Sequence, residues 1–149
     1  MEAVGQLLLS RSVWERIAEH ARAADPYEAV GILGGTGDGR IVYVAPLPNL
    51  AADGAFLADP RAQFEAERAL SRLKLIPLAA YHSHPGGTAT LSHADHVLAN
   101  PSLVQLVVAL GRAGRVDMRA YRVGADVHEV PLRIEYWSGH DARRPIVIG

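Results

Sequence analysis

The chain has 149 residues, of which 49% are hydrophobic, and this is enough apolar material to build one domain with its own core. Its 15 basic and 16 acidic side chains leave a formal net charge of -1, so it lacks the positive field by which nucleic acids and anionic membranes are usually held. There is no cysteine, which excludes disulfides and thiolate metal sites and leaves histidine and carboxylate as the strong zinc ligands.

The amino-terminal part contains one short apolar run, at residues 7–9. It is too short for the apolar segment of a signal peptide or for a transmembrane helix, so we expect a cytoplasmic protein. An amphipathic helix is predicted over about residues 11–24, because apolar side chains recur at intervals of four: Val13, Ile17 and Ala21. The dipeptide Asp25-Pro26 ends this helix.

Two strands should follow as a hairpin. Residues 29–35 form a nearly continuous apolar run closed by glycines, and residues 40–44 form its partner beyond a glycine-containing turn. Residues 46–59 show little periodicity, which indicates a connection over the surface that Phe56 could anchor.

A second helix is predicted from Pro60 to about Lys74, because Asp59 can cap it and proline suits its first position. Four of its side chains follow helical spacing: Phe64, Glu67, Leu70 and Leu73. A buried strand over residues 75–82, a short helix over 92–98 and three strands over 103–110, 116–123 and 127–132 complete the prediction. The tail after Ile134 lacks such patterns, and its Trp137 is either a packing anchor or a dimer contact.

The segment from Tyr81 to Asp95 has the spacing of a metal site. Residues two apart on a strand point to the same face with their Cα atoms ~6.5 Å apart, so His82 and His84 can converge. Ser92 is a natural cap for the helix that follows, and Asp95 would then lie at its third position, facing the histidines. Two imidazoles and a carboxylate leave the fourth position of a tetrahedral zinc site open for water.

Hydrolysis would also need a group that moves the protons of this water. Glu28 is the best candidate, because it opens an otherwise apolar strand, where burial would raise its pKa towards the range of a general base. The alternative is an exposed side chain at a strand edge, and the spacing alone leaves both interpretations open.

Taken together, these residues resemble the signature of the JAMM (MPN-plus) metalloproteases. The pattern is Glu28 with its apolar strand, then His82-x-His84-Pro85, six residues, Ser92, two residues and Asp95. Pro48-Asn49 with Phe56, Asp59 and Pro60 also resembles the prokaryotic members. The resemblance spans about residues 9–132, within a single domain of residues 1–149 that ends in a tail from residue 133.

The resemblance implies a fold, a cofactor and residue roles. The fold is of the α+β class, a mixed, curved sheet flanked by helices as in cytidine deaminases. His82, His84 and Asp95 would bind one zinc ion per chain, and Glu28 would act as general base and acid on the water. Ser92 would stabilise the oxyanion, and we expect it to serve as helix cap as well.

The resemblance also implies a substrate. Members of this family cleave amide bonds, commonly after the Gly-Gly end of ubiquitin-like or sulfur-carrier proteins, so a desampylase-like or deubiquitinase-like isopeptidase is expected. The connection at residues 97–102 is too short for a large insertion that grips a substrate. We therefore expect the substrate tail to lie near the Glu28 strand and the Gly86-Gly87 loop, added there as an extra strand.

Two other functional classes share this fold. A RadC-like protein would carry a similar His-x-His-Pro segment in a DNA-related context, but the Glu28 strand and the neutral charge argue against it. A non-catalytic MPN scaffold would usually lack the metal ligands, all of which this chain keeps.

Other conspicuous side chains are given ordinary roles. We expect surface positions for five histidines, of which the two on the site helix could also support the ligands: His20, His93, His96, His128 and His140. Tyr81 should lie in the core, although its hydroxyl could approach the site. A solvated face is favoured over a basic patch for Arg112, Arg115, Arg119 and Arg122.

Overall fold

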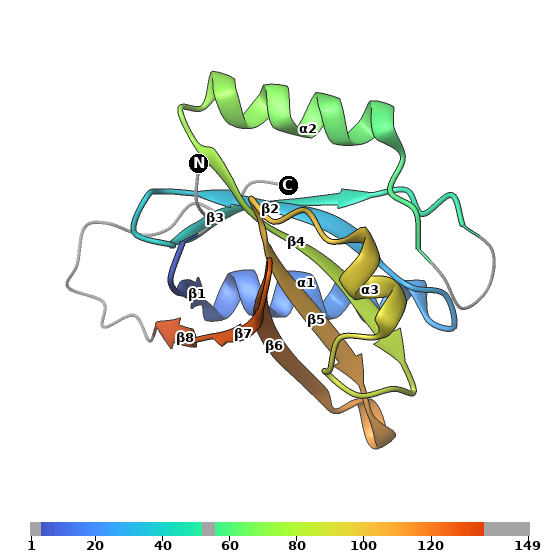
Figure 1. Ribbon diagram of the computed structural model, residues 1–149. Helices are drawn as coiled ribbons and strands as arrows, with labels where there is room; N and C mark the ends of the chain where they lie inside the picture. Colours follow the sequence, from blue (N-terminus) through green and yellow to red (C-terminus); the bar gives the residue numbers. More distant parts are fainter. Residues whose placement is uncertain (1–3, 52–55, 136–149) are drawn as a thin grey trace.

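The computed structural model describes residues 4–51 and 56–135 (Figure 1). In chain order, its elements are β1 (Leu7–Ser10), α1 (Arg11–Ala24), β2 (Val30–Gly35), β3 (Ile41–Leu47), α2 (Pro60–Arg72), β4 (Ile76–Pro85), α3 (His93–Leu98), β5 (Val104–Leu110), the 3-10 turn η1 (Arg112–Gly114), β6 (Val116–Val123), β7 (Val127–Val130) and β8 (Leu132–Glu135). Trp137 and His140 lie outside these ranges. None of the helices in the described part is long and apolar enough to cross a membrane.

The main sheet of the described residues has six strands in the order β3-β2-β4-β5-β6-β7. Strands β4 and β5 run parallel and the other neighbours run antiparallel, so the sheet is mixed, as the sequence predicts. The connection between the two parallel strands carries α3, the helix that holds Asp95. The predicted α+β class with a mixed sheet flanked by helices is therefore confirmed.

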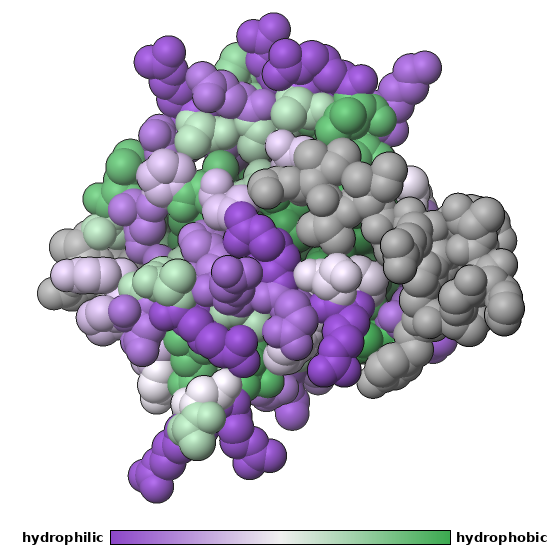
Figure 2. Space-filling view, turned by 180° about the vertical axis from the view of Figure 1, so that it is seen from behind, coloured by the Kyte–Doolittle hydropathy of each residue, from purple (hydrophilic) through white to green (hydrophobic). Residues whose placement is uncertain are grey.

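Helices cover both faces of this sheet, α1 below it and α2 above it in Figure 1. The predicted bounds of α1 are confirmed, and its Val13, Ile17 and Ala21 are buried against the larger of two apolar clusters. Helix α2 closes the smaller cluster over β2, β3 and β4. Seen from behind, hydrophilic side chains project from the α2 edge of the molecule (Figure 2).

The buried face of α2 differs from the one that the predicted helical spacing indicated. Ala66 and Leu70 are its buried residues, while Phe64 is 59% exposed and Leu73 is 45% exposed. The reason is close packing, because Leu70 fills the space over Gly34, where a Cβ atom would overlap its side chain. Ala66 and Leu70, rather than the aromatic Phe64, therefore face the sheet.

Strands β1 and β8 pair in parallel as a separate two-stranded sheet. Strand β1 was not predicted from the sequence, and a single strand over residues 127–132 was predicted where β7 and β8 lie. Pro131 breaks that strand because it has no N–H to donate, and its carbonyl accepts instead from Leu7. Regular structure thus extends to Glu135, three residues into the predicted tail, and β3 likewise extends to Leu47, beyond its predicted end.

Tyr81 and His20 link α1 to the centre of the sheet. Tyr81 is 2% exposed, as a core residue should be, but its hydroxyl lies 2.7 Å from Nδ1 of His20 on α1 rather than in the metal site. The surface role predicted for His20 is wrong, because this ring makes an edge contact with the buried phenol. Burial lowers the pKa of His20 and raises that of Tyr81.

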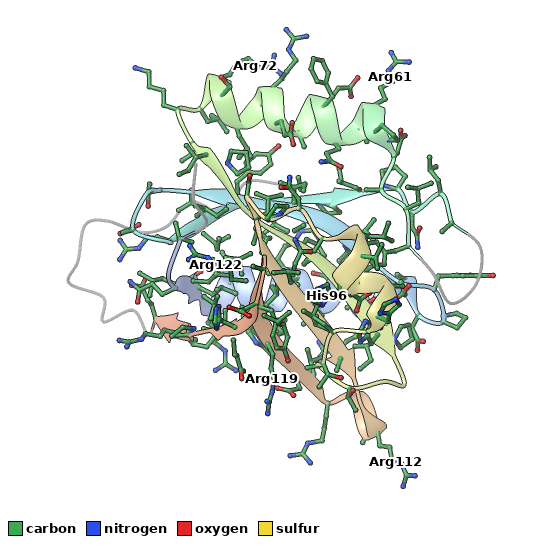
Figure 3. The ribbon with its side chains drawn as sticks, in the orientation of Figure 1. Arg61, Arg72, His96, Arg112, Arg119 and Arg122 are labelled. Carbon is green, nitrogen blue, oxygen red and sulfur yellow. The ribbon has the colours of Figure 1, made fainter. Side chains whose placement is uncertain are left out.

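The four arginines of the β5–β6 region do not form an unbroken basic surface. Arg119 lies 3.7 Å from Asp117 and 3.9 Å from Glu129, so acidic side chains divide the cations. Figure 3 shows Arg112 projecting away from the body of the protein at the turn before β6.

Gly31 makes room for the Tyr81 ring, because a Cβ atom on this residue would overlap the phenol. We expect Gly31→Ala to lower the free energy of unfolding by about 1–3 kcal/mol or more, as overpacking does in a dense core. Urea denaturation measures this loss. Gly124→Ala is the control, because a Cβ atom there meets no described atom within 4 Å; equal stability losses in the two variants would contradict the packing argument.

Candidate metal centre

Strand β4 positions the two histidines. The side chains of His82 and His84 lie on the same side of the strand, and their Nε2 atoms are 3.1 Å apart. His82 is 2% exposed, so its ring is fixed within the protein, whereas His84 lies nearer the surface. The predicted convergence of two imidazoles at the end of this strand is confirmed.

Helix α3 supplies the third group. Ser92 caps it through a capping box: its hydroxyl accepts from the N–H of Asp95, and its own N–H donates to Oδ2 of Asp95 at 2.8 Å. The same carboxylate oxygen lies 3.1 Å from Nε2 of His82 and 3.1 Å from Nε2 of His84. The cap therefore aims the carboxylate at the imidazole pair.

These three atoms suit a tetrahedral metal ion. They form a triangle with edges of 3.1 Å. A tetrahedral zinc shell with bonds of about 2.0–2.1 Å needs ligand atoms about 3.3–3.4 Å apart, so the triangle is within a few tenths of an ångström of that size. His82, His84 and Asp95 form the one group of this kind among the described residues.

The charges of the group also fit a cation. Burial disfavours the charged form of Asp95, but hydrogen bonds with both imidazoles and with Ser92 outweigh it and hold the pKa of the carboxyl well below its usual range. The bond with Asp95 raises the pKa of His84. Nδ1 of His84 lies 2.8 Å from the Thr88 carbonyl, and donating to it leaves Nε2 as the atom with a free lone pair.

Glu28 lies beside this triangle, with Oε1 3.9 Å from Nε2 of His84. Its side chain is 11% exposed, which favours the buried over the exposed interpretation of this residue. Burial raises the pKa of Glu28, although the two nearby imidazoles oppose the shift. A partly buried carboxylate with a raised pKa is suited to accepting a proton and releasing it again.

Ser83, which no sequence pattern singled out, fixes the main chain next to Glu28. Its Oγ accepts from the N–H of Ala29 at 2.7 Å, and its own N–H donates to the Ala29 carbonyl at 2.9 Å. Ser83 is fully buried between the two histidines of β4. It therefore ties the Glu28 segment to the ligand strand.

Phe56 also has a more direct role than that of a loop anchor. Its ring stacks on His82 with centroids 4.4 Å apart and an interplanar angle of 15°. Stacking on a fixed aromatic ring restricts the rotation of the His82 imidazole. The resemblance to prokaryotic relatives singled out this residue, but only the folded structure places it against a ligand.

A pocket of about 400 Å³ opens over the site, with an acidic and apolar lining: Pro26, Glu28, Phe56, His84, Pro85, Ser92, Ala94, Asp95 and Leu98. Ser92 thus lies where a reacting group could meet its hydroxyl. Gly86 and Gly87 lie in the turn after β4, outside this lining, and Gly87 donates to the His84 carbonyl. Their role in substrate binding stays a prediction.

His93 and His96 are exposed on α3, as predicted (Figure 3 labels His96). Residues one or two positions apart on a helix do not point the same way, so neither histidine shares the face of Asp95.

The chain resembles known proteins in sequence and in fold. Residues 10–124 match the family model described as prokaryotic homologs of the JAB domain. A curated protein of Thermus thermophilus, described as a probable TtuB-protein conjugate cleaving protease, is 40% identical over 91 residues. The match covers 60% of this chain, which spans about three fifths of the length of that relative.

Solved structures share the fold. A protein from Desulfitobacterium hafniense has a TM-score of 0.81 at 31% identity, covering 93% of this chain and 99% of its own. A protein from Salinibacter ruber has a TM-score of 0.66 at 22% identity, covering 87% and 92%. A JAB1/MPN domain protein from Archaeoglobus fulgidus has a TM-score of 0.59 at 19% identity, covering 86% and 98%.

Ser83→Ala should destabilise the protein, because the N–H of Ala29 loses its acceptor in a buried position. An unsatisfied buried donor of this kind costs about 1–3 kcal/mol, measured as a lower free energy of unfolding in urea. Ser102→Ala, at an exposed serine of the chain, is the control and should change stability little. Equal stability of Ser83→Ala and the unmodified protein would show that the bond contributes nothing.

Proposed function

The chain belongs to the family of prokaryotic homologs of the JAB domain, and from this premise we propose that it is a zinc-dependent isopeptidase or peptidase. Its proposed substrate is the amide bond that follows the C-terminal Gly-Gly of a ubiquitin-like or sulfur-carrier protein. We also propose that residues 1–149 act as a single catalytic domain. The observation that carries the proposal is the Glu28 carboxylate, 3.9 Å from a ligand atom of the His82, His84 and Asp95 triangle.

His82, His84 and Asp95 would hold the zinc ion. When bound, zinc acts as a Lewis acid, polarising a carbonyl and lowering the pKa of water. Glu28 accepts the proton of the attacking water as the C–O bond forms, and it returns this proton to the amine nitrogen as the C–N bond breaks. The raised pKa of Glu28 suits both transfers.

Ser92 is proposed to stabilise the oxyanion. Its Oγ accepts the N–H of Asp95 at 3.1 Å, which leaves the hydroxyl proton available to a group in the pocket. Developing negative charge on the substrate carbonyl oxygen is the natural acceptor. A serine can therefore cap α3 and serve the reaction at once.

Catalysis is favoured over a structural metal site or a binding scaffold. A structural zinc site closes its fourth position with a protein ligand, whereas a pocket lined by His84, Asp95 and Glu28 lies open beside the three groups here. A binding scaffold would gain nothing from a partly buried carboxylate beside the histidines, because burying the charge of Glu28 is unfavourable.

The substrate class rests on two supports. The resemblance to JAMM proteases implies carriers that end in Gly-Gly, and the Thermus thermophilus relative is described as cleaving TtuB-protein conjugates. A carrier conjugated through its C-terminal glycine to a lysine is accordingly the proposed substrate.

The first prediction of this proposal concerns the metal. We expect the purified protein to bind about one zinc ion per chain, measured by elemental analysis, and a chelator to abolish cleavage. His84→Ala should reduce zinc affinity at least about tenfold, because it removes one of the three ligand atoms. His96→Ala, on the exposed face of α3, is the matched control and should keep full zinc content. Normal zinc affinity of His84→Ala would overturn the proposed ligand set.

The second prediction concerns Glu28. Glu28→Gln should lower kcat by about 10²–10⁴-fold while zinc content stays unchanged, because the amide cannot accept the proton. The assay is cleavage of a Gly-Gly carrier conjugated to lysine, followed by intact mass. Glu65→Gln, at an exposed position of α2, is the control and should keep full activity. Full activity of Glu28→Gln would rule out its role as general base.

A further inference from the structure

We propose that Asn49 is a positioning residue that holds the main chain of Glu28 in place for proton transfer. The inference rests on the proposed function, because it concerns the same carboxylate. It adds a residue on the opposite flank of Glu28 from Ser83, in the loop that follows β3. Asn49 does not touch the reacting atoms in this proposal and acts through Glu28.

The side-chain amide of Asn49 makes bonds in two directions. Its Nδ2 donates to the Glu28 carbonyl at 3.0 Å. Its Oδ1 accepts from the N–H of Ala51 at 3.0 Å and from the N–H of Leu57 at 2.9 Å. A donor and an acceptor on one short side chain are needed for this arrangement, and asparagine provides both.

The position of Asn49 just beyond the end of β3 explains why a side chain, rather than the main chain, bonds the Glu28 carbonyl. Strands β2 and β3 pair antiparallel with Val30 opposite Leu47, so continuing the register places Glu28 opposite Asn49. The strand pairing has ended before this point, because β2 begins at Val30 and β3 ends at Leu47. The Asn49 amide supplies the hydrogen bond that the next rung of the ladder would have given the Glu28 carbonyl.

The two ends of the loop that follows Asn49 are bonded to each other. Leu50 donates to the Leu57 carbonyl at 2.8 Å, and Asp59 donates to the Pro48 carbonyl at 3.0 Å. Asn49 also forms a β-bridge with Ala58 at the neck of this loop. The amide is therefore anchored to a fixed frame when it binds Glu28.

Residues 28 and 29 are consequently held from both sides. Ser83 holds Ala29 from β4, between the two histidines, and Asn49 holds Glu28 from the β3 side. Together these bonds fix where the Glu28 side chain leaves the main chain relative to the metal ligands. A catalytic group displaced by about 1 Å can lose about 10²-fold in rate, so this placement matters for turnover.

Two variants separate the bond to Glu28 from the other roles of Asn49. Asn49→Asp keeps the acceptor for Ala51 and Leu57 but removes the donor to Glu28 and adds a charge. Asn49→Ala removes the donor without adding charge but also releases the loop. A loss common to both variants therefore reports the Nδ2 donor, which both of them lack.

We expect both variants to lower kcat about 10- to 100-fold on a Gly-Gly carrier conjugated to lysine, with KM and zinc content unchanged. Asn100→Asp is the matched control, because the Oδ1 of Asn100 accepts from Ser102 two residues on, as Asn49 does from Ala51, without touching Glu28. The control should keep its kcat. A loss in Asn49→Asp alone would assign the effect to charge, and a loss in Asn49→Ala alone would assign it to the loop; either result overturns the proposal.

A second readout does not depend on activity. The ¹³C resonance of the Glu28 carbonyl should shift in both variants, and the N–H of Leu57 should keep its exchange protection in Asn49→Asp but lose it in Asn49→Ala. If the unmodified, zinc-loaded protein cleaves no conjugate, the proposed function fails while this measurement still decides the inference. An unchanged Glu28 carbonyl resonance in both variants would refute the positioning role.

Discussion

The convergence of two imidazole nitrogens on one carboxylate oxygen is the constraint on which this structure depends. Three electron-rich atoms at mutual distances of 3.1 Å are stable together only with protons or a cation among them. Two of these atoms come from a strand and the third from a helix 11 residues further along the chain. The parallel crossover between β4 and β5 brings them together, because it returns the chain over the end of β4 with α3 in the connection.

The short connection from β4 to α3 is held in place at several points, so the site does not depend on a free loop. His84 binds the Thr88 carbonyl, and the Tyr121 hydroxyl donates to the Ala89 carbonyl at 2.6 Å. One bond ties the connection to the ligand strand and the other ties it to β6. A helix of six residues would be marginal alone, and these bonds together with the capping box account for its fixed position.

Local patterns in the sequence predicted much of the fold and the centre of the site. Alternation along β4 and the cap at Ser92 depend on neighbouring residues, so they were readable without the fold. The pairing of β1 with β8 joins residues about 125 positions apart, and nothing local at Leu7 indicates its partner. The stacking of Phe56 on His82 and the contact of His20 with Tyr81 arise in the same way, from elements that meet only when the sheet is complete.

Most bonds that fix the site are also bonds that fold the protein, and this explains how a small domain can hold the partly buried carboxylate of Glu28. The Oδ2 atom of Asp95 caps α3 and faces both histidines, so folding of the helix orders the ligand before any metal arrives. Ser83 completes the β2–β4 pairing and orders Glu28 in the same way. Because these groups are ordered during folding, the entropic penalty of ordering them is not incurred again when metal binds or the reaction occurs. The unfavourable burial of Glu28 is then balanced by the stability of the whole sheet, because Glu28 leads directly into β2, which pairs with the histidine strand β4.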